Sequence, residues 1–267
     1  FFVIIRNSRK AEGTFSYKMK KKDSLNTLEL FAGVGGFRVG LERADDELFV
    51  TKWANQWEPS KKVQEAFDCY NTHFPDSLNL NEDISKVPDA FFEGLDVSLI
   101  CGGFPCQDYS VARSLSGGMG IEGKKGVLFW EIVRAIRLSN PKYVLLENVD
   151  RLLKSPVSKR GRDFSIMLAA FNNLDYTVEW RVINADEYGF AQKRRRIYIF
   201  AYRNDLPFYN EQKAFEDEEL LFKEGFYAKE FPVQNYMVKN RITKGELSSD
   251  IVDISDNYAA QLWNSGI

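Results

Sequence analysis

The sequence predicts an α/β fold built on a mostly parallel seven-stranded sheet whose last strand runs antiparallel. Between residues 25 and 203, short apolar runs alternate with segments of helical periodicity, which is typical of a parallel sheet covered on both faces. The last two runs are joined by a loop without a helix, so we expect one of them to reverse direction. Polar motifs follow several of the runs, at the strand ends where such sheets bind ligands.

Seven apolar runs are predicted as strands, over residues 27–31, 47–55, the neighbourhood of Leu78, 97–101, 143–149, 176–184 and 196–202. Apolar residues that recur at intervals of three and four predict helices near residue 37, from Pro59 to Tyr70, over 128–136 and over 164–171. Pro59 suits a first helical turn, and the predicted buried face of its helix is formed by Val63, Ala66, Phe67 and Tyr70. After residue 205 the pattern weakens, with further helices expected over 211–224 and 253–263.

Composition limits the possible functions. At 267 residues and 30.8 kDa, the chain can bury one substantial core with a small appended region. The net charge of −2 is not that of a strongly basic protein, so charge alone does not indicate nucleic-acid binding. A single histidine, His73, excludes hydrolases with a histidine base and multi-histidine metal sites, and it is predicted to lie on the surface. Cys69, Cys101 and Cys106 suit neither disulfides nor zinc, so we expect a reducing, cytoplasmic setting and no metal. No apolar run reaches the roughly 20 residues of a membrane span.

The first strand runs into a glycine-rich turn, Phe31-Ala32-Gly33-Val34-Gly35-Gly36. Glycines let a ligand approach the backbone and leave N–H groups exposed at the next helix start, although a purely steric turn would explain them equally well. Two candidates follow the next strands: Trp57 offers an aromatic face to an adenine, and Asp83, beside Ile84, offers a carboxylate to an exocyclic amine. Trp57 could instead be a core residue and Asp83 a helix cap. One nucleoside could span all three strand ends.

A cysteine follows the strand 97–101 in Gly102-Gly103-Phe104-Pro105-Cys106-Gln107. A thiolate is a good nucleophile and a good leaving group, and Cys106 sits after a proline in an exposed type of turn. The alternative, a buried core cysteine, describes Cys101 better. The strand 143–149 ends in Glu147 and Asn148, which are predicted as a general acid with a raised pKa and a residue that positions either this acid or its loop. Glu147 could instead cap a helix.

Two basic stretches are candidates for contact with a polyanion. Residues 111–126 combine five glycines with Arg113, Lys124 and Lys125, and are predicted to form a lid that closes on nucleic acid; a plain surface loop is the alternative. The run 192–196, which begins at Gln192 and holds Arg194 and Arg196, is by default a solvated surface.

In combination, these motifs resemble those of the DNA cytosine-5 methyltransferases, in the order that family uses. The resemblance covers residues 27–203 and implies a Rossmann-like S-adenosylmethionine-dependent methyltransferase fold. It further implies methyl transfer to C5 of a cytosine flipped out of double-stranded DNA, through a covalent bond from Cys106 to C6. A bacterial restriction-modification system with a cognate endonuclease is the expected context, and a monomer the expected state.

The resemblance also assigns residue roles. Residues expected to act in catalysis are Cys106, Glu147, Asn148, Arg194 and Arg196. Residues expected to bind S-adenosylmethionine are Phe31, Ala32, Gly33, Val34, Gly35, Gly36, Gln56, Trp57, Asp83, Ile84, Pro105 and Leu128. Residues expected to contact DNA are Gln107, Ser110, Arg113, Lys124, Lys125 and Gln192.

The chain departs from the family pattern in two places. Gln56 stands where many members carry an acid for the ribose hydroxyls, so the ribose ligand is open between Gln56 and the nearby Glu58. The closing family motifs are absent, so we expect a basic extension over 1–24, a catalytic domain over 25–204 and the beginning of a target-recognition region over 205–267. Two alternatives stay open, a catalytically silent binding module and a transfer-RNA methyltransferase of the DNA-enzyme type. The recognised DNA sequence is not predicted.

Overall fold

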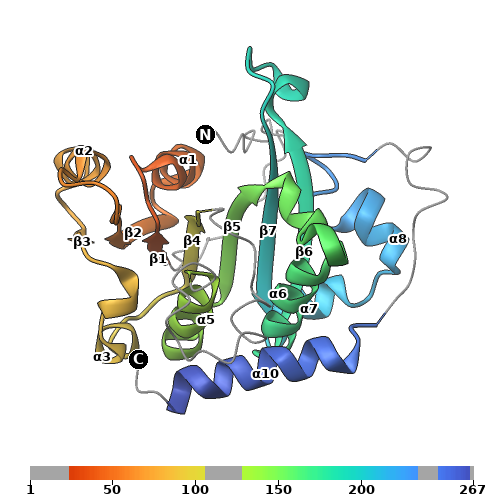
Figure 1. Ribbon diagram of the computed structural model, residues 1–267. Coiled ribbons are helices and arrows are strands. Elements are labelled where there is room, and N and C mark those ends of the chain that lie inside the picture. Colours follow the sequence, from red (N-terminus) through yellow and green to blue (C-terminus); the bar gives the residue numbers. More distant parts are fainter. Residues whose placement is uncertain (1–23, 106–127, 234–245, 265–267) are drawn as a thin grey trace.

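The computed structural model describes residues 24–105, 128–233 and 246–264 and contains the predicted seven-stranded sheet (Figure 1). Its order is β3-β2-β1-β4-β5-β7-β6. The strands are β1 (Leu25–Leu30), β2 (Phe49–Asn55), β3 (Leu78–Leu80), β4 (Leu99–Gly103), β5 (Tyr143–Val149), β6 (Tyr176–Asn184) and β7 (Arg195–Arg203). Strand β7 lies between β5 and β6 and is antiparallel to both, whereas the other pairs are parallel. The predicted fold class and its antiparallel last strand are confirmed.

Side chains alternate between two cores, one on each face of the sheet. Along β5, Val144 and Leu146 belong to the larger core, and Leu145 belongs to the smaller one. The larger core is closed by α3 (Asp89–Glu93), α5 (Leu128–Ser139) and α6 (Arg162–Asn172). The smaller core is closed by α1 (Gly36–Asp45) and by residues between 206 and 231. Because both faces are covered, most sheet residues are apolar, and a polar residue inside a strand stands out.

The remaining helices are short, except for one near the end of the chain. They are α2 (Glu65–His73), α7 (Pro207–Gln212), α8 (Asp217–Glu219), the π-helical turn η5 (Leu220–Glu224), α10 (Ser249–Asn264) and the 3₁₀ turns η1 (Ile84–Lys86), η2 (Asp150–Lys154), η3 (Val157–Lys159) and η4 (Ala185–Tyr188). Figure 1 shows α10 running alongside α6 and α5, and Tyr258 of α10 stacks on Trp130 of α5 at 4.2 Å between ring centroids. Within the described ranges, no helix is both long and apolar enough to cross a membrane.

The predicted helix from Pro59 begins six residues late, which is a correction. Residues 59–64 form turns instead, and Val63 is 62% exposed rather than buried. The Gln64 side chain explains the delay, because it accepts a hydrogen bond from the Glu58 N–H and donates to the Glu58 and Lys61 carbonyls. These bonds stabilise the turn, and the helix starts only at Glu65.

Candidate active site

Glu147 lies near the carboxyl end of β5, and little of it is exposed. Its Oε1 forms an ion pair with Nε of Arg196 on β7, at 2.8 Å. Burial raises the pKa of Glu147, while Arg196 and Arg194 oppose the rise. The carboxyl is therefore held in a setting that favours its protonated form more than water does, which is what a general acid requires.

The close packing of β4 against β1 and against Glu147 explains its two glycines. Gly103 is the register partner of Glu147, and a Cβ built on it would lie 3.0 Å from Glu147 Oε2. A Cβ on Gly102 would lie 2.1 Å from the carbonyl oxygen of Leu30 on β1. Both glycines belong to β4 rather than to the loop that the sequence predicted, because close packing and not turn formation requires them there.

Asn148 connects the end of β5 to the loop that leads to Cys106. Its Nδ2 donates to the Phe104 carbonyl at 3.1 Å, and its Oδ1 accepts from the Val149 N–H at 2.8 Å. Phe104 is itself buried against Phe129, so the chain is fixed one residue before the exposed Pro105. Cys106, Gln107, Ser110, Arg113, Lys124 and Lys125 lie outside the described residues.

The residues of the basic run 192–196, which leads into β7, lie in different environments. Arg196 is partly buried against Glu147, whereas the Nε of Arg195 lies 3.2 Å from Asp150 with over half of its side chain exposed. Arg194 is also partly buried and lowers the pKa of Glu147. Gln192 is exposed. Alternation along β7 therefore directs Arg196 toward Glu147 and Arg195 away from it. Arg194 precedes the strand and acts on Glu147 through its charge.

The glycine-rich turn follows β1 in a left-handed backbone conformation. Phe31, Gly33 and Gly35 have φ values of 54°, 57° and 91°. A Cβ on Gly33 would meet nothing within 4 Å, so the turn is open on that side, and Val34 is 62% exposed. A Cβ on Gly35 would lie 2.5 Å from the Phe74 ring, so this glycine is needed for packing as well.

Among the other cofactor candidates, Gln56 contacts this turn directly. Gln56 Oε1 accepts the Gly33 N–H at 2.7 Å, so its Nε2 is the end that can reach a hydroxyl. Asp83 Oδ1 accepts from both the N–H and the hydroxyl of Ser85, which makes Asp83 the cap of η1 that the sequence had offered as an alternative. The Ile84 side chain is buried in the larger core, and Trp57 and Leu128 are partly buried.

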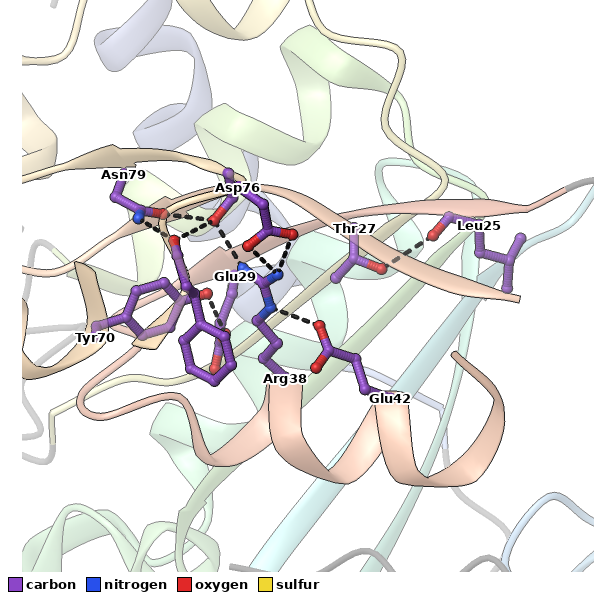
Figure 2. A network of polar contacts seen from close by, with 10 residues as sticks. Leu25, Thr27, Glu29, Arg38, Glu42, Tyr70, Asp76 and Asn79 are labelled. Atoms are coloured by element: carbon purple, nitrogen blue, oxygen red, sulfur yellow. Dashed lines mark hydrogen bonds and ion pairs between the residues drawn. The ribbon is translucent and has the colours of Figure 1, made fainter. Parts of the chain in front are cut away.

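Sequence reasoning missed a polar network in which Glu29, Arg38 and Tyr70 are buried and Asp76 is exposed (Figure 2). Glu29 of β1 is fully buried and accepts the Tyr70 hydroxyl at 2.9 Å. Arg38 of α1 binds both carboxylate oxygens of Asp76, at 2.8 and 2.7 Å, and Glu42 at 2.6 Å. Backbone N–H groups of residues 37 and 38, at the start of α1, also act on the Glu29 carboxyl. The signal in the sequence was a charged residue inside an apolar strand.

This network gives a stability prediction. Burial raises the pKa of Glu29 from 4.5 to about 7, against the effects of Tyr70 and Arg38, and Cys101 is its neighbour on β4. At pH values between the unfolded-state pKa of 4.5 and the folded-state pKa of about 7, the folded state binds more protons than the unfolded state. The contribution of Glu29 to the free energy of unfolding is therefore largest below about pH 4.5. It falls as pH rises through about 7, by about 3 kcal/mol. Glu29→Gln cannot ionise, so urea unfolding at pH 5 and pH 8 should show a smaller difference than in the wild type. Glu42→Gln should keep the wild-type difference in unfolding free energy between pH 5 and pH 8. If Glu29→Gln also kept that difference, the assignment of the pH dependence to Glu29 would be contradicted.

Comparison with known proteins identifies the family of this chain. A model of the C-5 cytosine-specific DNA methylase family matches residues 25–264. The chain belongs to that family. It is 54% identical to the Type II methyltransferase M.Sau3AI of Staphylococcus aureus over 248 residues, 92% of this chain and 60% of the relative. It is 35% identical to the Type II methyltransferase M.HhaI of Haemophilus parahaemolyticus over 201 residues, 74% of this chain and 56% of the relative.

This C-5 cytosine methylase chain thus spans about 60% of the length of the curated relatives it matches. Solved structures share its fold. A DNA modification methyltransferase encoded within an E. coli prophage has a TM-score of 0.54 at 24% identity, covering 74% of this chain and 50% of that chain. The S. pombe Dnmt2 methyltransferase has a TM-score of 0.53 at 21% identity, covering 69% and 51%. The described residues contain no group of three or more His, Cys, Asp or Glu side chains placed to hold a metal ion.

Proposed function

We propose that this chain is the catalytic part of a DNA (cytosine-5)-methyltransferase that uses S-adenosylmethionine and forms a covalent bond from Cys106 to C6 of cytosine. One observation carries the proposal: the buried Glu147 carboxyl, paired with Arg196, lies beside the Asn148-anchored segment that leads into Pro105 and Cys106. An acid and a nucleophile carried by neighbouring strand ends are what addition to a pyrimidine ring requires.

The chemistry follows from the reluctance of cytosine C5 to act as a nucleophile. Addition of the Cys106 thiolate to C6 moves electron density toward N3, where Glu147 supplies a proton or a hydrogen bond. The resulting enamine makes C5 nucleophilic. Arg196 restrains the Glu147 carboxyl during this step, and Asn148 restrains the backbone before Cys106. Once C5 has gained the methyl group, transfer of the C5 proton to a solvent base breaks the bond from Cys106 to C6, expels the thiolate and restores the aromatic ring, and the N3 proton returns to Glu147.

The residues at the β1, β2 and β3 ends fit an S-adenosylmethionine site by their chemistry. The open side of Gly33 leaves room above the turn, Trp57 offers an aromatic face, and Asp83 offers Oδ2 to an exocyclic amine. Gln56 Nε2 is the proposed donor to a ribose hydroxyl, and Glu58 is the alternative. Phe31, Ala32, Val34, Gly35, Gly36, Ile84, Pro105 and Leu128 complete the proposed site. When bound, S-adenosylmethionine would supply the electrophilic methyl group.

Double-stranded DNA is the proposed substrate, with the cytosine rotated out of the helix because C6 is unreachable inside a stacked duplex. Gln192, Arg194 and the residues of 107–125 named above are the proposed DNA contacts. Residues 205–267 are proposed to begin the target-recognition region. The Type II names of the relatives support a bacterial restriction-modification context. A cognate endonuclease as genetic partner, a cytoplasmic setting and a monomeric state are proposed with it.

Bisulfite sequencing tests the proposal directly. The chain is expressed in a bacterial host free of cytosine methylation, and its genomic DNA is sequenced after deamination. Protected cytosines in one recurring sequence context are expected. If DNA is unprotected while host transfer RNA carries 5-methylcytosine, the substrate assignment is wrong. If a chain that binds S-adenosylhomocysteine protects neither, the silent binding module is supported instead.

A further inference from the structure

A buried arginine outside the proposed catalytic set is tied to the adenine end of the cofactor site. Arg134 lies on α5 and is 6% exposed. Its Nη2 donates to the Ile84 carbonyl at 2.8 Å, and its Nη1 donates to the Val87 carbonyl at 3.0 Å. Ile84 and Val87 are the first residue of η1 and the residue after it. One guanidinium therefore binds both ends of the turn that Asp83 begins.

The remaining contacts of Arg134 hold it in that position. Its Nε donates to Glu131 Oε2 at 2.7 Å, and its Nη1 also reaches Asp89 Oδ1 at 2.6 Å. The guanidinium carbon lies 4.9 Å from the centroid of the Phe92 ring. Glu131 is fully buried and lies on α5 three residues before Arg134. The helix itself therefore sets the position of Glu131 relative to Arg134. A planar group with this many donors suits several simultaneous bonds, which a lysine cannot reproduce.

The turn that Arg134 contacts is short, and it is held by two buried side chains, Ile84 and Val87, as well as by the guanidinium. Strand β3 has only three residues, and η1 is a single 3₁₀ turn. Within the turn, Asp83 caps η1 through Ser85, and the Asn55 side chain donates to the Glu82 carbonyl at 2.8 Å. The buried side chains hold the turn against the core, and Arg134 adds two long-range hydrogen bonds that fix its backbone to α5, whose first residue, Leu128, belongs to the same proposed cofactor site.

We propose that Arg134 is a positioning residue for adenine recognition: it fixes the η1 turn so that Asp83 can select a ligand with an exocyclic amine. This inference rests on the proposed S-adenosylmethionine site and adds to it a residue that touches no ligand.

Calorimetric titration of the whole chain with two nucleosides tests the role without any turnover. The ligands are S-adenosylhomocysteine and its deaminated analogue S-inosylhomocysteine, which carries an oxygen in place of the amine. The wild type should prefer the adenine ligand, because a carboxylate pairs with a donor and repels an acceptor. In Arg134→Lys the preference should fall by about tenfold, mainly through loss of adenine affinity.

Two further variants separate positioning from general damage. Asp89→Asn removes the ion pair between Asp89 and Arg134 but leaves both carbonyl bonds, so it should keep the wild-type preference. The double variant Glu131→Gln with Arg134→Met removes the buried charges together, avoids an unpaired Glu131, and should show the same reduced preference as Arg134→Lys. Parallel weakening of both ligands at an unchanged ratio would overturn the role of Arg134. A wild-type chain that binds neither nucleoside would overturn the proposed function itself.

Discussion

Cys106→Ala should abolish methyl transfer while cofactor affinity stays within about twofold of the wild type, since the proposed nucleophile touches the base and not the adenosine. The measurement uses DNA containing the target site found by bisulfite sequencing. Methyl incorporation reports turnover, and titration with S-adenosylhomocysteine reports binding. Cys69→Ala is the matched control, because Cys69 lies on α2 and is partly exposed.

A trapping experiment makes this prediction specific to the covalent step. With 5-fluorocytosine in the target site, the wild type should form a complex that survives denaturing electrophoresis, because the fluorine at C5 cannot leave as a proton does. Cys106→Ala should form none. Turnover above one hundredth of the wild-type rate in that variant would refute the nucleophile assignment, and loss of cofactor binding would make Cys106 structural.

Glu147→Gln should lower the turnover number by about 10²- to 10⁴-fold, the usual contribution of a positioned acid. Glutamine keeps the shape of the side chain and its distance from Gly103 but cannot donate a carboxyl proton. Cofactor affinity should be nearly unchanged. Steady-state kinetics on the same DNA checks this, and a loss of less than fivefold would show that Glu147 is not the acid.

The neighbouring arginines provide a pH test of the same residue. Burial raises the pKa of Glu147 and Arg196 lowers it, and the proposed mechanism requires the acid form. The rate should therefore fall as pH rises through that pKa. Arg196→Met should move this fall to higher pH, because the opposing cation is gone. Arg195→Gln should leave it in place, since Arg195 pairs with Asp150 at the surface. Equal profiles for all three proteins would contradict the pairing of Arg196 with Glu147.

The order of strands and helices was predictable because the spacing of apolar residues, every second residue in a strand and every third or fourth in a helix, is a local property of the sequence. The boundaries were less so where side chains intervene, as when Gln64 binds the Glu58 backbone and delays α2. The reversal of one of the last two strands could also be predicted, because no helix separates them. Which of the two lies inside the sheet could not, since β7 pairs with both β5 and β6 through contacts distant in sequence.

Within the candidate site, residue types were predictable and their partners were not. The chemistry of Cys106, Glu147 and the glycine turn depends on residue identity and on position at a strand end, and both are written in the sequence. That Arg196 and not Arg195 faces Glu147 depends on strand register. The Gly33 bond to Gln56 likewise joins residues 23 apart that meet only once β1 and β2 are paired.

The sequence by itself determined the fold class, the family resemblance and the identity of the reactive side chains, because these depend on local patterns and on functional groups. Only the tertiary structure decided what surrounds these side chains. It determined the burial and ion pair that act on the pKa of Glu147, the hydrogen bonds of the buried Glu29, and the hydrogen bond from Arg134 to the turn after Asp83. Burial and long-range hydrogen bonds decide such properties, and both exist only when distant segments pack together.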